Sequence, residues 1–248
     1  MTRPLTLSFR EAGTGFPVVC LHASAGGPGQ WRSLMARLAD RYRVIAPSRI
    51  GYGGNAPWPT DRPARLEDEV TALAPLLDTL GPSFAIVGHS FGGAVAFKAA
   101  LRHPERVRAL VVYEPGLFSA LVRHRQGAPI TAAFVALAEE TTRAVKDGDL
   151  AGAAARFVDY WNGPGSWDAT PAERRGAIQE GVRQLPAEWE ASLGEPDILA
   201  ELATLATRHS TSPAPPRPSP VARSPISSRR PCRAASGASS RGWGTWGR

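Results

Sequence analysis

The stretch AIVGHSFGGAVAF, residues 85–97, decides the fold. An apolar run typical of a buried strand ends at Gly88 and His89, and a helix of small residues begins at Phe91. Ser90 stands at the sharp turn between them, and flanking glycines let helix and strand approach closely. The pattern predicts a nucleophile at the carboxyl edge of a sheet. The alternative is a serine that caps a helix in an ordinary strand–helix turn.

Strands alternate with helices along the first half of the chain. Apolar runs predict strands, and apolar residues at helical spacing predict helices between them. Such alternation implies right-handed crossovers and a mainly parallel sheet, so the predicted fold class is α/β. The predicted strands are 5–13, 16–24, 42–48, 83–90 and 108–116, and the predicted helices are 27–42, 65–81 and 91–107.

The second half has a different composition. Helical periodicity without strands continues to about residue 204, which predicts a helical lid inserted over the sheet. We divide the chain into a core at 1–116, a lid at 117–195 and a return to the core at 196–207. Residues 208–248 are rich in Pro, Ser and Arg and have no apolar periodicity, which predicts a disordered tail.

The net charge of +7 belongs to this tail. Eight of the 29 basic residues lie in 208–248, which has no acidic residue, so 21 basic residues face 22 acidic ones elsewhere. We therefore expect a small-molecule substrate and no nucleic-acid or membrane partner, and no cofactor or metal. Two cysteines, Cys20 and Cys232, and an N-terminus without an apolar segment indicate the cytoplasm. The sequence predicts no oligomeric state.

A glycine-rich loop, LHASAGGPGQW at 21–31, follows the second predicted strand. This loop begins at the carboxyl end of its strand, which is the sheet edge where Ser90 is also expected. We expect the backbone N–H of Phe91 and that of Ala23 or Ser24 to stabilise an oxyanion there. The alternative is a plain glycine-rich turn.

Together these segments resemble the α/β-hydrolase superfamily, in its lidded esterase-like and carbon–carbon-bond hydrolase branches. The resemblance covers about residues 5–207, and it is closest in 21–27, 44–59, 87–93 and 103–115. Ser48 departs from the family, which often has Asp there, at a position that is not catalytic. A serine at the turn argues against the epoxide-hydrolase and haloalkane-dehalogenase branches, which use Asp.

The resemblance implies a histidine after the last strand, and none stands there. The five histidines are His22, His89, His103, His124 and His209. They lie in the glycine-rich loop, beside Ser90, at a helix end, in the lid and at the start of the tail. Nothing beyond Leu205 is typical of a strand, so the family's last two strands are also missing from the prediction.

We therefore hypothesise that residues from about 207 onward come from a frameshift. Read two bases onward, GWGTWGR at 242–248 permits Leu-Gly-His-Met-Gly-Pro, a segment of the kind that carries the family's histidine. In the same frame SPISSRRPC at 224–232 permits an apolar helix, and RHSTS at 208–212 permits a strand. The alternative is a genuine Arg/Pro/Ser tail.

The resemblance also implies a carboxylate that orients the histidine. A minority of the family has it after the sixth strand, where Glu114 stands; the alternatives are an acid lost with the C-terminus and a solvated loop glutamate. Lid aromatic residues predict an apolar substrate pocket, namely Phe118, Phe134, Trp161 and Trp167.

We expect a serine hydrolase that acts on an ester or related acyl or carbon–carbon bond of a small apolar molecule, with turnover reduced by several orders of magnitude in this chain for lack of the histidine. The alternatives are a ligand-binding protein without catalysis and a protein that binds nucleic acid or another anion through its tail.

Overall fold

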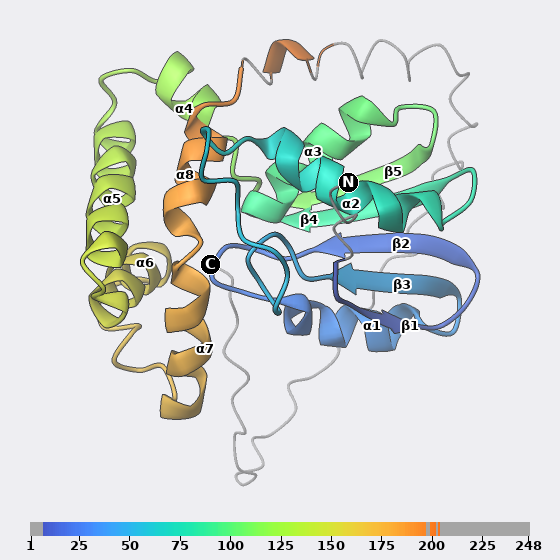
Figure 1. The fold of residues 1–248 in the computed structure, drawn as a ribbon, viewed down its shortest axis with the longest axis horizontal. Coiled ribbons are helices and arrows are strands. Elements are labelled where there is room, and N and C mark those ends of the chain that lie inside the picture. The colour runs from blue at the N-terminus through green and yellow to red at the C-terminus, as the bar shows by residue number, and fades with distance from the viewer. Residues whose placement is uncertain (1–6, 197–198, 202, 204–248) are drawn as a thin grey trace, which may run out of the picture.

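The five predicted strands form one sheet in the order β1-β3-β2-β4-β5 in the computed structural model, which describes residues 7–196, 199–201 and 203 (Figure 1). All neighbours are parallel except β1, which pairs antiparallel with β3. This confirms the predicted α/β class. The strands are β1 (Phe9–Ala12), β2 (Phe16–Leu21), β3 (Tyr42–Pro47), β4 (Phe84–His89) and β5 (Val107–Tyr113).

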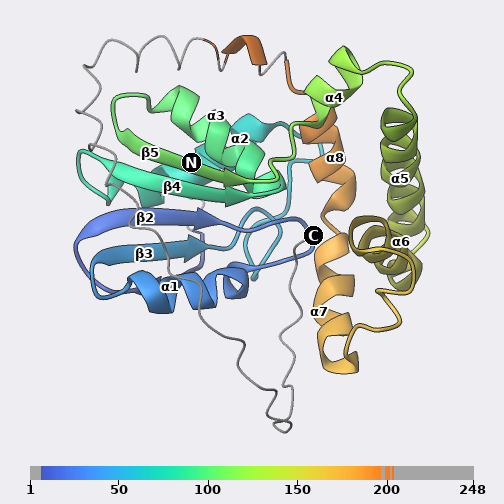
Figure 2. The ribbon, with the colours of Figure 1, turned by 180° about the vertical axis from the view of Figure 1, so that it is seen from behind.

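Helices cover both faces of the sheet because successive residues of a strand point to opposite sides. Val18 and Cys20 of β2 pack with Met35 on one face, where the short η1 (Pro28–Trp31) leads into α1 (Arg32–Leu38). Val19 and Leu21 join the larger core on the other face, beneath α2 (Leu66–Asp78) and α3 (Phe91–Arg102). Figures 1 and 2 show, from opposite sides, α1 on one face of the sheet and α2 and α3 on the other.

After β5 the described residues form five helices that stand at the carboxyl ends of the parallel strands, and we call this group of helices the lid (Figures 1 and 2). It has an apolar core of its own, in which Phe134, Phe157 and Trp189 are buried. Its helices are α4 (Phe118–His124), α5 (Pro129–Lys146), α6 (Leu150–Asn162), α7 (Ala172–Val182) and α8 (Leu185–Leu193).

Of the segment expected at 196–207, the structure describes residues 196, 199–201 and 203; the segment expected at 208–248, with His209, lies outside the described residues. Within the described part of the chain, no helix is long and apolar enough to cross a membrane.

Strand β5 forms an edge of the sheet. Among the described residues it pairs only with β4, and no strand follows it. Its side chains Val111 and Tyr113 are 57% and 48% exposed. An exposed apolar edge with free backbone groups can pair with other chains.

We expect Val111→Lys to reduce self-association while changing the free energy of unfolding by no more than about 0.5 kcal/mol. Its matched control is Val19→Lys, at a fully buried position in β2, which should prevent folding. Size-exclusion chromatography and urea denaturation measure the two effects. Unfolding of the Val111→Lys chain would mean that this edge is covered.

Candidate active site

Ser90 occupies the turn between β4 and α3 with a strained backbone, φ 54° and ψ −123°. Its N–H donates to the carbonyl oxygen of Tyr113 over 3.0 Å, and its own carbonyl accepts from Gly93 and Gly116, each over 2.8 Å. A residue keeps such a conformation only where its surroundings fix it. Here these hydrogen bonds do so, together with one over 3.2 Å from the Ala94 N–H to the Ser90 carbonyl, and Ser90 stays partly exposed at the start of α3.

The glycines around Ser90 are required by close backbone contacts. A Cβ atom at Gly92 would collide with the carbonyl oxygens of Leu21 and His22, and one at Gly88 with that of Gly92. The first turn of α3 therefore lies directly against the glycine-rich loop after β2, as the sequence pattern indicates.

Gly116 lies over the backbone N–H of Phe91, one of the predicted oxyanion donors. A Cβ atom at position 116 would stand 3.2 Å from the Phe91 nitrogen. This N–H is at the first position of α3, where no intrahelical acceptor exists. The small residue at 116 thus leaves the donor uncovered.

The glycine-rich loop uses one of its two candidate donors internally. The Ala23 N–H donates to the side-chain oxygen of Gln30 over 3.0 Å, and the Gln30 amide contacts Nδ1 of His89 over 3.0 Å. The Ser24 N–H has no hydrogen bond with any described residue. Of the pair named from the sequence, Ser24 is therefore the uncommitted donor.

His22 is fully buried and serves the loop itself. Its Nε2 accepts the N–H of Arg49 over 3.3 Å, so Nδ1 carries the proton and donates to the Ala23 carbonyl over 2.8 Å. Burial and the Arg49 charge lower the pKa of His22 well below its usual range. The ring stays neutral, with both nitrogens occupied.

No described histidine has a hydrogen bond with the Ser90 hydroxyl. His89 precedes Ser90 and packs on Tyr113, with ring centroids 5.2 Å apart, and burial lowers its pKa while the charge of Glu114 opposes this. His103 follows the end of α3 and His124 ends α4. The Ser90 hydroxyl makes no hydrogen bond within the described residues.

Glu114 follows β5 in a left-handed conformation, φ 45°, and is exposed. Its side chain hydrogen-bonds the hydroxyl of Tyr113, which raises the pKa of that phenol. The predicted acid thus lies beside His89 and Tyr113 at the same edge of the sheet as Ser90.

The aromatic residues predicted to line a pocket differ in position. Phe118 reaches Ser90's surroundings, since a Cβ at Gly116 would lie 3.1 Å from its ring. Phe134 stacks on Phe118 at 4.1 Å but is 1% exposed, within the lid's own core. Trp161 is 43% exposed, and Trp167 is buried beneath the guanidinium of Arg175.

An open groove of about 500 Å³ lies between two lid helices, and Ser90 is not among its lining residues. Its walls come from α5 and α8, and include Thr142, Lys146 and Trp189.

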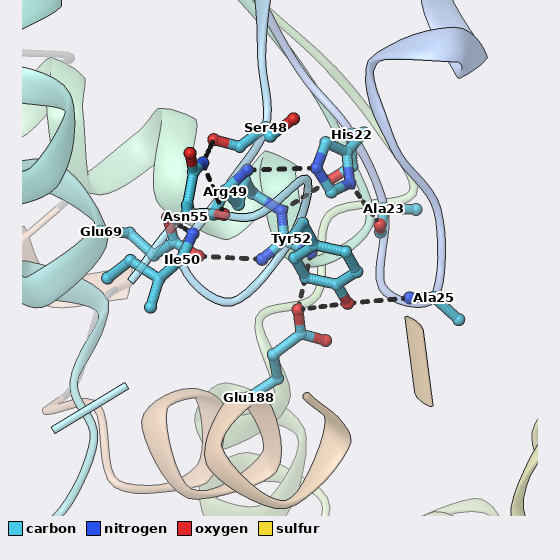
Figure 3. Close-up of polar contacts among 10 residues, drawn as sticks. All are labelled: His22, Ala23, Ala25, Ser48, Arg49, Ile50, Tyr52, Asn55, Glu69 and Glu188. Carbon is cyan, nitrogen blue, oxygen red and sulfur yellow. Dashed lines mark hydrogen bonds and ion pairs between the residues drawn. The ribbon is translucent and has the colours of Figure 1, made fainter. Parts of the chain in front are cut away.

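A buried ionic cluster lies behind the glycine-rich loop (Figure 3). The Arg49 guanidinium donates to Glu69 over 3.0 Å, to Glu188 over 2.6 Å and to the His22 carbonyl over 3.0 Å. All three charged side chains are fully buried. Tyr52 adds a hydrogen bond to Glu188 over 2.9 Å. One cation thus faces two carboxylates.

The sequence pattern did not indicate this cluster. Arg49 stands in a different loop, the one after β3. Glu69 and Glu188 stand on helices, and charged residues on helices are usually solvated. The only local signal is an arginine between the buried strand β3 and a turn rich in glycine.

The excess negative charge affects Glu69. Burial raises the pKa of its carboxyl to about 7, Glu188 adds to the increase, and Arg49 opposes it. At a pH between the usual pKa of 4.5 and about 7, the Glu69 carboxyl therefore keeps its proton in the folded chain and loses it in the unfolded chain. The stability contributed by this group is therefore full at low pH and is lost as the pH rises through 7.

We expect Glu69→Gln to remove this pH dependence. Between pH 5 and pH 8 the free energy of unfolding of the unsubstituted chain should fall, relative to the variant, by up to about 3 kcal/mol. Urea denaturation at each pH measures the difference, in which the opposing effect of His22 cancels. Thr71→Ala, on the same helix, should keep the original slope; an unchanged slope in Glu69→Gln would contradict the assignment.

Comparisons with known proteins agree with the fold. A family model described as alpha/beta hydrolase fold matches residues 17–191. Among solved structures, an alpha/beta hydrolase from Sphaerobacter thermophilus superposes with a TM-score of 0.63 at 20% identity, covering 83% of this chain and 78% of that one. A hydrolase from Pseudomonas aeruginosa also gives 0.63, at 23% identity, covering 80% and 72%.

Curated relatives match a shorter stretch. The chain is 40% identical over 111 residues to a 2-hydroxymuconate semialdehyde hydrolase of Pseudomonas sp. strain CF600, covering 42% of this chain and 38% of that protein. It is 31% identical over 115 residues to a cis-3-alkyl-4-alkyloxetan-2-one decarboxylase of Shewanella oneidensis, covering 45% and 36%. The matched stretch spans less than half of each of these relatives. The family model covers most of the chain, and the chain belongs to the α/β-hydrolase fold family.

Proposed function

We propose that this chain is a hydrolase that uses Ser90 as nucleophile on an ester or a related acyl or carbon–carbon bond of a small apolar molecule. The observation that carries the proposal is the strained backbone of Ser90 at the start of α3, against the loop after β2. The name of the Pseudomonas relative, a semialdehyde hydrolase, favours a small-molecule substrate.

In the proposed first step the Ser90 oxygen attacks the substrate's carbonyl carbon and gives up its proton to a base. The carbonyl oxygen then carries a negative charge, which the N–H groups of Phe91 and Ser24 and the dipole of α3 would stabilise. Ser24 replaces Ala23 in this role because Gln30 holds the Ala23 N–H. Collapse expels the leaving group, which takes up the proton, and water then hydrolyses the acyl-enzyme.

The base is a histidine in this chemistry, with a carboxylate to orient it. We propose Glu114 as that carboxylate, because it lies beside β5 at the edge of the sheet that carries Ser90. For the histidine we propose the alternative reading frame beyond about residue 207. The exposed edge at β5 supports this reading, since an added strand would cover it.

The chain as written should therefore react slowly. Loss of a triad member lowers turnover by about 10⁴–10⁶-fold, so a nitrophenyl ester should give no fast burst. A fluorophosphonate probe should still label Ser90 slowly, as detected by mass spectrometry. Ser90→Ala should abolish labelling, whereas the matched control Ser33→Ala, on exposed α1, should not. A burst as fast as that of a complete triad would contradict the missing base.

The nucleotide sequence tests the reading frame directly. We expect the frame two bases onward from about codon 207 to stay open and to encode a Gly-His segment near its end. A stop codon early in that frame, or no histidine codon near its end, would overturn the frameshift proposal. A chain expressed from the restored frame should recover turnover.

Ligand binding without turnover is the second candidate function. It is favoured by the absence, among the described residues, of a histidine bonded to the Ser90 hydroxyl. Thermal stabilisation by a small apolar ester that is not hydrolysed would support it. A cytoplasmic location, and a small-molecule partner rather than a nucleic acid or a membrane, remain part of the proposal.

A further inference from the structure

The glycine-rich loop contains a strained residue of its own, in addition to the strained Ser90 at the start of α3. Ala25 has φ 53°, a left-handed conformation that residues with a Cβ atom rarely adopt. It lies one residue beyond Ser24, the uncommitted N–H donor. Contacts that hold Ala25 in this conformation therefore restrain the chain next to the Ser24 N–H.

Two hydrogen bonds connect Ala25 to the lid (Figure 3). The Ala25 N–H donates to the hydroxyl oxygen of Tyr52 over 3.0 Å, and that hydroxyl donates to Glu188 over 2.9 Å. Tyr52 and Glu188 are buried. Because Glu188 belongs to α8, these two hydrogen bonds in series connect the loop to a lid helix.

Helix α7 meets the same residue by direct backbone packing. A Cβ atom at Gly181 would lie 2.8 Å from the Cα of Ala25. A side chain there would push helix and loop apart. By contrast, Gly176 of the same helix has open space around its Cβ position.

Glu188 also reaches the beginning of the loop, through Arg49. Its carboxylate accepts a hydrogen bond from the Arg49 guanidinium. The Arg49 Nε–H donates to the carbonyl oxygen of His22, and the Arg49 backbone N–H donates to Nε2 of its ring. Both His22 and Ala25 are thus held by groups that bind Glu188. The Arg49 guanidinium also lies 4.7 Å from the ring centroid of Phe91.

We propose that Tyr52 and Glu188 form a latch, which holds the loop at 22–25 in its strained conformation while α7 and α8 are docked. They are positioning residues, since neither touches reacting atoms. The mechanical coupling stands on contacts alone; its effect on an oxyanion rests on the proposed function.

Hydrogen exchange with mass spectrometry, on the full 248-residue chain, tests the coupling without requiring activity. Tyr52→Phe removes the acceptor of the Ala25 N–H, so exchange in a peptide spanning 22–31 should rise about 3- to 10-fold. Exchange in α3 should not change. The matched control is Tyr160→Phe in the lid, which should leave the loop protected.

A second pair of variants acts from the lid side. Gly181→Ala should speed exchange in both the loop and α7–α8, whereas Gly176→Ala should change neither. Glu188→Gln retains an oxygen that accepts from Tyr52 and Arg49, so the loop should stay protected. Glu188→Leu should release the loop and α8 together. Rescue by Gln separates hydrogen bonding from the need for a charge.

Loop exchange in Tyr52→Phe equal to that of the unsubstituted chain would overturn the latch, as would equal effects of Gly181→Ala and Gly176→Ala. Slow fluorophosphonate labelling of Ser90 is the second measurement. If Ser90 is not labelled in any variant while the exchange results hold, the proposed function fails and the latch stands. If Ser90 is labelled but hydrogen exchange in the loop does not change in the variants, the latch fails and the proposed function stands.

Discussion

The buried guanidinium of Arg49 is the interaction on which the arrangement of the site depends. It lies between Glu69 of α2 and Glu188 of the lid, and it also binds the loop through His22. Removing one partner of a buried ion pair typically costs about 3–5 kcal/mol, because a charge is left uncompensated. The sheet layer, the lid and the loop therefore keep their relative positions as one unit.

The strained backbones show how that unit serves the site. In the described chain the non-glycine residues with positive φ are Ala25, Ser90 and Glu114, and all three lie at the carboxyl edge of the sheet. Ser90 is fixed by backbone hydrogen bonds, whereas Ala25 is fixed by a tyrosine and a lid helix. Ser90 is thus positioned by the core, and the loop beside it by the lid.

The sequence predicted the strands and the turn at Ser90 because these follow from local apolar runs and glycine spacing. It did not predict the ionic cluster, since Glu188 lies 139 residues from Arg49 and no local pattern pairs them. It named Ala23 and Ser24 together, because only the position of the Gln30 side chain distinguishes them. Phe134 was named for the pocket, but helix packing buries it within the lid.

The environment of the Glu188 carboxylate has a consequence for movement of α8. Its second carboxylate oxygen is buried and has no hydrogen bond with the described residues. Moving α8 outward would hydrate that oxygen but would also break the hydrogen bonds that Arg49 and Tyr52 donate to Glu188. A movement of α8 away from the sheet would therefore leave Ala25 without the tyrosine–glutamate connection to the lid.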